Sequence, residues 1–312
     1  MQVSRTLRNA RSLVTIFLVT AMMSRSHASP DAQQRGEREG AAAGARQGGA
    51  GGRGGGGGLA AKNPDLPAGA FTAASTIART TLRHEWVDIP FGGQRLHTWI
   101  EYPNRTDPAP VVVVMSHEAG LDDWMRAVAD QLATQGFIAV APDILSGRGP
   151  NGGNFDSFRF AADVVQANEK LPQDDAMRRY KAALDYARKL PGASARSASL
   201  GVGMGGADSF RFAAEVPNLD ATVVFYGVSP DETVLANVKA PVAGFYGEDD
   251  PRVMPTVRAA EATMKRLGKL FEVHVYPGAT QAFLRSSVEG QNADAGLAAW
   301  PAAIQFLRQH VN

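Results

Sequence analysis

The chain has 312 residues, with 32 Lys and Arg against 31 Asp and Glu, and it has no cysteine. Its length allows one large α/β domain or two smaller domains. Its almost balanced charge provides no strong field to recruit nucleic acid or an acidic membrane surface. Without cysteine there can be no disulfide, no thiolate nucleophile and no lipid-modified cysteine.

Residues 1–28 have the order of a secretory signal peptide. Arginines come first, an apolar run follows at 13–23, and Ser26, His27 and Ala28 end the segment. The run is shorter than the ~20 residues that a membrane-spanning helix needs. We therefore expect cleavage after Ala28 and export to the periplasm or the extracellular space, with no membrane span afterwards. An uncleaved N-terminal anchor is the alternative.

Residues 29–67 consist mainly of Gly, Ala, Arg and Gln and include five consecutive glycines at 54–58. Such a segment buries too little apolar surface to offset the entropy cost of ordering it, so we expect a disordered linker. Its Arg-Gly pairs could touch nucleic acid or an anionic surface. The arginines are few and Glu37 and Glu39 lie nearby, which favours a solvated linker instead.

From residue 68 to residue 312, apolar strands alternate with amphipathic helices, which predicts one α/β domain with a mostly parallel sheet covered on both faces. Segments 84–91 and 94–101, joined by two glycines, predict an antiparallel hairpin at the sheet edge. The β-branched run at 110–116 is typical of a central strand. Further strands are expected at 137–142, 198–202, 221–226, 242–246 and 271–276, and helices at 122–135, up to about 190, 255–267 and 293–310.

The segment Gly201-Val202-Gly203-Met204-Gly205-Gly206 has the glycine spacing of a nucleophile elbow. An elbow is a sharp strand-to-helix turn that presents a Ser or Cys, flanked by glycines because side chains would clash there. Gly203 occupies the nucleophile's position. The backbone N–H of Met204 heads the following helix and could still help to bind an oxyanion or another anion.

Together with this elbow, four further segments resemble the dienelactone hydrolase family, and the resemblance covers most of residues 82–310. The segments are 110–120, 140–143, 246–251 and 276–283. The resemblance implies an α/β-hydrolase fold and hydrolysis of esters or lactones. It also implies that nucleophile, acid and histidine follow one another in that order along the chain.

The resemblance places the family's acid at Asp250, its nucleophile at Gly203 and its histidine at Gln281. A glycine has no atom with which to attack, and a glutamine amide does not accept a proton near neutral pH, so two of the three triad roles are unfilled. The resemblance also matches Glu118 to an acidic residue beside the nucleophile. It matches Arg285 to an arginine that holds a substrate carboxylate, a role that suits a guanidinium fork. A solvated surface position is the alternative for Arg285.

His117 follows the central strand at the edge where this type of sheet binds ligands, so we expect it at the site. Ser116 and Ser209 lie on no strained turn, and we interpret both as structural. His274 lies within a strand and is expected to be packed or at an edge.

A metal site built from His117, Glu118 and Asp143 is disfavoured, because consecutive strand residues point apart and no His-x-x-x-His spacing is present. Asp249 and Asp250 lack the ligand spacing of a calcium loop. We expect neither a metal nor a cofactor.

Three functional hypotheses follow. The first is an exported dienelactone-hydrolase-like protein that lacks the usual hydrolytic chemistry and binds a small molecule, with a carboxylate as the expected group. The second is an active ester or lactone hydrolase with an unusual arrangement, in which Glu118, Asp250 or His117 activates water. The third is a structural or partner-binding domain whose pocket has filled in.

Overall fold

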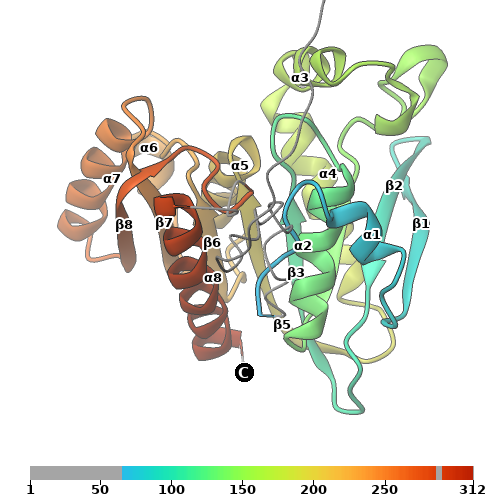
Figure 1. Ribbon diagram of the computed structural model, residues 1–312, viewed down its shortest axis with the longest axis horizontal. Coiled ribbons are helices and arrows are strands. Elements are labelled where there is room, and N and C mark those ends of the chain that lie inside the picture. The colour runs from blue at the N-terminus through green and yellow to red at the C-terminus, as the bar shows by residue number, and fades with distance from the viewer. Residues whose placement is uncertain (1–64, 286–289, 312) are drawn as a thin grey trace, which may run out of the picture. The chain divides into compact units, whose positions relative to one another are not determined.

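The computed structural model describes residues 65–285 and 290–311. The predicted signal peptide and all but the last three residues of the predicted linker lie outside the described residues. The described part of the chain forms a sheet with helices on both faces (Figure 1). None of its helices combines the length and the apolar character needed to cross a membrane.

The sheet has eight strands in the order β1-β2-β4-β3-β5-β6-β7-β8. Strands β1 and β2 form the predicted hairpin, and β2 pairs antiparallel with β4, whereas all other neighbours pair in parallel. The strands are β1 (His84–Phe91), β2 (Gln94–Glu101), β3 (Ala109–Met115), β4 (Ile138–Pro142), β5 (Ala193–Val202), β6 (Ala221–Phe225), β7 (Val242–Asp249) and β8 (Phe271–Thr280).

Strand β3 shows why the sheet must be covered on both sides. All seven of its residues are buried. Val112 and Val114 pack into one hydrophobic cluster, and Val111 and Val113 pack into the other. Successive side chains of a strand point to opposite faces, so a continuous β-branched run fills two apolar layers at once.

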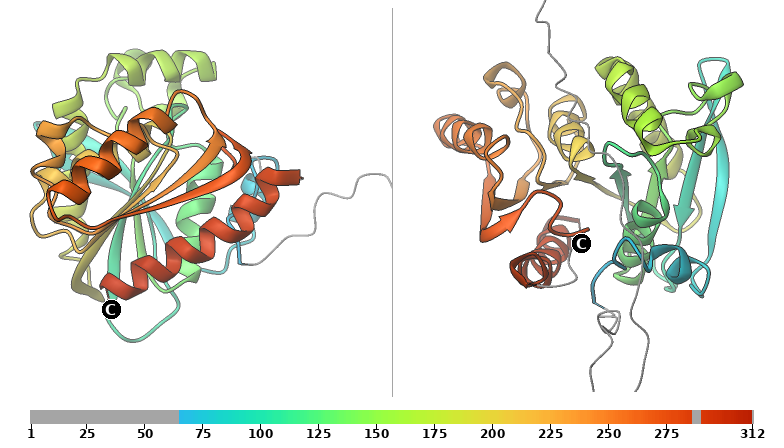
Figure 2. Two further views of the ribbon diagram at one scale, coloured as in Figure 1. Left: turned by 90° about the vertical axis from the view of Figure 1, so that its left-hand side faces the viewer. Right: turned by 45° about the horizontal axis from the view of Figure 1, so that its top comes forward.

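The helices divide between those two layers. The cluster on one face contains residues of α2 (Asp123–Thr134) and α8 (Gly290–Val311). The cluster on the other face contains residues of α4 (Gln173–Ala187), α5 (Met204–Glu215) and α7 (Met254–Arg266). Figure 2 shows α7 and α8 on opposite sides of the sheet. The predicted α/β-hydrolase architecture is therefore confirmed.

The structure also differs from the expected elements in small ways. Strand β5 begins at Ala193, five residues before the expected start. Its first residues include Ser194, Ala195 and Arg196 and lack the apolar run that marked the buried part. Two short helices were not expected, α1 (Ala73–Ile77) and α6 (Glu232–Leu235). The expected helical region before residue 190 divides into α3 (Ala161–Lys170) and α4 at Leu171 and Pro172.

Candidate functional site

The turn between β5 and α5 has the backbone of an elbow. Gly203 has φ 59° and ψ −117°, in the left-handed half of backbone space that residues with a side chain rarely adopt. Its N–H donates to the carbonyl oxygen of Phe225 at 3.0 Å, which ties the turn to the end of β6. The predicted strand-turn-helix geometry is confirmed.

The glycines around Gly203 are required by close backbone packing. A Cβ added to Gly201 would lie 1.8 Å from the carbonyl oxygen of Gly205. A Cβ on Gly205 would lie 2.2 Å from the carbonyl oxygen of Met115, and one on Gly206 would lie 2.7 Å from that of Phe225. Helix α5 therefore starts in backbone contact with the ends of β3 and β6, which leaves no room for side chains.

Gly203 differs from those three glycines, because a side chain there would meet another side chain. A Cβ on Gly203 would lie 2.9 Å from Oε2 of Glu118 and 3.7 Å from Cβ of His117. Glu118 is exposed, and its main-chain oxygen accepts a hydrogen bond from Nδ2 of Asn168, on α3, at 2.8 Å. The carboxylate of Glu118 thus lies beside the place where a nucleophilic side chain would stand.

Asp250 follows β7 and is 3 % exposed. Its Oδ1 accepts hydrogen bonds from the backbone N–H groups of Arg252 at 3.2 Å and Val253 at 3.1 Å. Its Oδ2 is buried and has no hydrogen-bond donor among the described residues. Gln281 follows β8 and is exposed. The carboxylate is therefore held by the backbone, and the amide of Gln281 does not supply a donor to Oδ2.

His117 and Arg285 meet at Asp122, the N-cap residue of α2. Nδ1 of His117 accepts from the N–H of Ala119 at 3.2 Å, so Nε2 carries the proton of the neutral ring and faces Oδ2 of Asp122 at 3.2 Å. Nη2 of Arg285 donates to the same oxygen at 3.0 Å. Oδ1 of Asp122 accepts from the N–H of Met125 at 3.0 Å.

These contacts change the acidity of Asp122. Burial favours the neutral acid, but the neighbouring His117 ring, the hydrogen bond from the N–H of Met125 and the charge of Arg285 outweigh burial, so the pKa of Asp122 lies below its ordinary value. Asp122 therefore carries a negative charge that partly neutralises Arg285. That Arg285 and His117 contact a ligand stays a prediction, since both already contact Asp122.

Sequence reasoning named Asp122 only as the start of a helix. The available signal was its position, because an aspartate immediately before an apolar-periodic segment is a typical N-cap. The ion pair with Arg285 joins residues 163 positions apart, and a helix pattern contains no information on such a contact.

Two further residues at the same edge of the sheet have unusual backbones. Tyr226 has φ 40° and Ala282 has φ 61°, and neither is a glycine. The Tyr226 hydroxyl is buried, and burial together with the charge of Glu118 raises its pKa far above the ordinary value. Strained residues of this kind persist where the surroundings hold them, and they are concentrated at binding and catalytic sites.

The remaining candidates have structural surroundings. Ser209 is buried and hydrogen-bonds to Ser199 at 2.8 Å and to the carbonyl oxygen of Val223 at 3.1 Å, which confirms that it is structural. Ser116 is buried, and its hydroxyl has no hydrogen-bond partner among the described residues. His274 stacks on Phe245 with 4.8 Å between ring centroids, as expected of a packed strand residue.

Asp143 organises a loop. Its two carboxylate oxygens accept from the N–H groups of Leu145 at 2.9 Å and Phe155 at 2.7 Å. Across residues 65–285 and 290–311, no group of three or more His, Asp and Glu side chains is placed to hold a metal ion.

Comparison with known proteins gives a consistent result. The model of the "Dienelactone hydrolase family" matches residues 96–311. A protein named "Probable 2-oxo-3-(5-oxofuran-2-ylidene)propanoate lactonase", from Bradyrhizobium sp, is 29% identical over 250 residues, which cover 75% of this chain and 98% of that protein.

Solved structures agree in fold. A dienelactone hydrolase-like promiscuous phosphotriesterase from metagenomic libraries has a TM-score of 0.62 at 24% identity, covering 75% of this chain and 100% of that one. A dienelactone hydrolase from Anabaena variabilis has a TM-score of 0.58 at 19% identity, with the same coverage.

Proposed function

The chain belongs to the dienelactone hydrolase family, and we propose that it is a member whose site binds a small molecule without the covalent hydrolysis of a triad. The observation that carries this proposal is the placement of Glu118 beside Gly203. Where a Ser or Cys would attack, the chain has no reactive atom, and a carboxylate oxygen lies 2.9 Å from the position of the missing Cβ. Acyl transfer through a covalent intermediate needs both that atom and a base to activate it.

The surroundings support a binding role. Buried polar atoms without a hydrogen-bond partner among the described residues occur at Ser116, Asp250 and Arg285. A buried polar atom without a partner costs free energy, so each of these three side chains has capacity for a hydrogen bond to a ligand or an ordered water molecule. The strained backbones of Tyr226 and Ala282 also belong to strand ends at this edge.

We further propose that the ligand carries a carboxylate. Arg285 has a side chain 37% exposed, so its guanidinium can accept an anion while it keeps Asp122 as a neighbour. The Bradyrhizobium relative is named for a lactone that also bears a carboxylate, and a ligand of that class suits this arrangement.

A second candidate function is slow hydrolysis assisted by Glu118. The observation in its favour is the same carboxylate, which is exposed and adjacent to the N-terminus of α5, where the N–H of Met204 has no partner within the helix. Glu118 would then deprotonate a water molecule that attacks a reactive ester. Positioning and an oxyanion site accelerate such reactions far less than a complete triad does.

Turnover of 4-nitrophenyl acetate by the wild-type chain, beside Glu118→Gln, separates these two functions. The binding proposal predicts the same rate for both proteins, equal to the rate in buffer. A wild-type rate well above that of buffer, lost in Glu118→Gln, would support hydrolysis and contradict the binding proposal.

Binding itself is tested with a butenolide carboxylate, by calorimetry on the wild type and on Arg285→Gln. The matched control is Arg266→Gln, because Arg266 has a side chain 57% exposed and is also ion-paired, to Glu232. We expect at least tenfold weaker binding in Arg285→Gln alone, since a charge-assisted hydrogen bond is lost. Identical results for all three proteins would favour the structural or partner-binding hypothesis.

Export also remains our proposal, and it depends on residues 1–28. N-terminal sequencing of protein recovered from the periplasm or the medium should begin at residue 29. A mature protein that begins at residue 1 and fractionates with membranes would favour the uncleaved anchor.

A further inference from the structure

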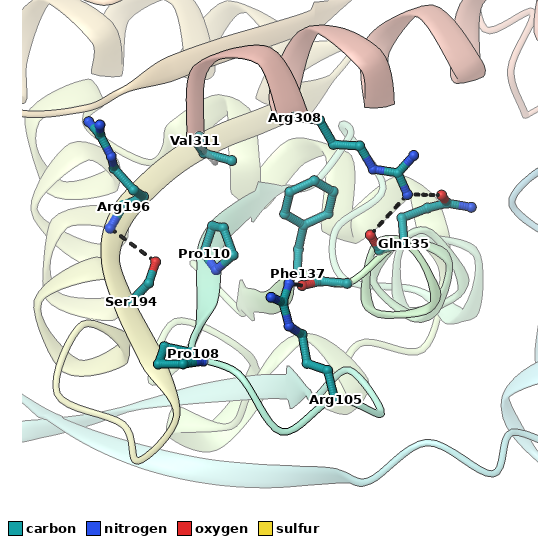
Figure 3. A pocket seen from close by; sticks show the side chains of 10 residues that line it. Arg105, Pro108, Pro110, Gln135, Phe137, Ser194, Arg196, Arg308 and Val311 are labelled. Carbon is teal, nitrogen blue, oxygen red and sulfur yellow. Dashed lines mark hydrogen bonds between the residues drawn. The ribbon is translucent and has the colours of Figure 1, made fainter.

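A pocket of about 520 Å³ lies where the parallel strands β3 and β5 begin, whereas the elbow lies where β5 ends. It is bordered by the first residues of β3 and β5, the C-terminal end of α2 and the last turn of α8 (Figure 3). Its volume is within the ~300–1,000 Å³ of typical small-molecule sites. Strand β5 runs from the pocket to the elbow, and its ten residues correspond to a length of about 30 Å. The pocket is therefore separate from the site at Gly203.

Three arginines line this pocket, and none of its described lining residues is acidic. Arg196 is ion-paired with Asp220 at 2.6 Å. Arg105 and Arg308 have no acidic partner among the described residues, and Figure 3 shows them on two sides of Phe137. The pocket thus contains two positive charges that no described carboxylate neutralises.

Arg105 and Arg308 do have a structural role, but it uses only part of their hydrogen-bonding capacity and none of their charge. Nη1 of Arg105 donates to the carbonyl oxygen of Gly136 at 3.4 Å, and Nη2 of Arg308 donates to the carbonyl and side-chain oxygens of Gln135 at 3.2 and 2.7 Å. These bonds satisfy the end of α2. The acceptors are neutral, and a guanidinium has five N–H donors, so charge and donors remain for a ligand.

Part of the pocket wall is apolar. Pro108, Pro110, Phe137 and Val311 line it. We propose that this pocket binds an organic anion with at least two negative charges, whose acidic groups contact Arg105 and Arg308 and whose hydrocarbon part packs on this apolar wall. A guanidinium pairs with both carboxylate and phosphate, so either group satisfies the charges.

The test is calorimetric titration of the full chain with phenyl phosphate, benzene-1,3-dicarboxylate and inorganic phosphate. We expect both aromatic dianions, or one of them, to bind saturably to the wild type, which identifies the preferred acidic group. Inorganic phosphate should bind at least fivefold more weakly because it cannot use the apolar wall. Equal affinity for phenyl phosphate and inorganic phosphate would overturn the organic part of the proposal.

The variants are Arg105→Gln, Arg308→Gln and their combination, since glutamine retains a donor for α2 while removing the charge. We expect at least tenfold weaker binding in the combined variant. Arg105→Gln alone should also weaken binding and is expected to fold, because the Arg105 guanidinium makes a single long hydrogen bond within the described part of the chain. Arg266→Gln should bind like the wild type. Absence of saturable binding, or binding that is unchanged in both Arg105→Gln and Arg308→Gln, would overturn the proposal.

Discussion

The elbow after β5 and the loop after β8 lie at the same edge of the sheet, but packing constrains them very differently. At the elbow, a Cβ on Gly205 or Gly206 would meet the ends of β3 and β6, and a Cβ on Gly201 would meet the backbone of Gly205, so packing fixes all three glycines. After β8, by contrast, Gln281 is exposed. Packing alone therefore accounts for the elbow backbone, and an intact elbow is not by itself evidence of an active enzyme.

Gly205→Ala tests whether backbone packing fixes the elbow, and it should have the largest effect on stability. The new Cβ would lie 2.2 Å from the carbonyl oxygen of Met115, so α5 or β3 must move. We expect a loss of about 3 kcal/mol or more in the free energy of unfolding, measured with urea. A loss below about 1 kcal/mol would show that the elbow is not fixed by backbone contact.

Asp122→Asn tests whether the charged residues of the site also contribute to the stability of the fold. Asparagine can still cap α2, but it loses the charge that faces His117 and Arg285, so we expect a loss of about 2 kcal/mol at pH 7. Asp123→Asn is the control, because Asp123 is 45% exposed and its pair with Arg126 should contribute less than about 1 kcal/mol.

The effect of Asp122→Asn should depend on pH in a defined direction. The pKa of Asp122 is lowered in the folded state, so its stabilisation is complete above the ordinary value of 3.8 and is lost as the pH falls through the folded value. The difference between wild type and variant should therefore shrink below pH 3.8. A difference that is constant from pH 7 to pH 3 would contradict the ionic role.

Gly203→Ala should have a smaller effect than Gly205→Ala, of about 1–2 kcal/mol, because the new Cβ meets only the movable carboxylate of Glu118 and the main cost is the positive φ. Gly268→Ala isolates that cost, since Gly268 has φ 66° and nothing within 4 Å of the added Cβ. In a Glu118→Ala background, Gly203→Ala and Gly268→Ala should lower the free energy of unfolding by the same amount. Equal losses of stability for Gly203→Ala and Gly205→Ala would show that backbone contact does not distinguish the two positions.

The strands, the elbow and the family could be predicted from the sequence because they depend on local patterns. A β-branched run, a glycine spacing and a helix start are each contained in a few residues. The sequence could not predict three other features: the ion pair between Asp122 and Arg285, the hydrogen bond from Asn168 to Glu118, and the lack of a donor to Oδ2 of Asp250 among the described residues. They join residues from distant segments, and only the folded sheet brings those segments together.

The most direct test of the central claim is the turnover of 4-nitrophenyl acetate and of a butenolide carboxylate by Gly203→Cys/Gln281→His. The full chain, each single variant and the double variant with Asp250→Asn serve as controls. We expect a wild type at the rate of buffer and a double variant at least about a hundredfold faster than either single variant, with the gain lost in Asp250→Asn. A wild type that already turns over either substrate, or a folded double variant no faster than the wild type, would contradict it.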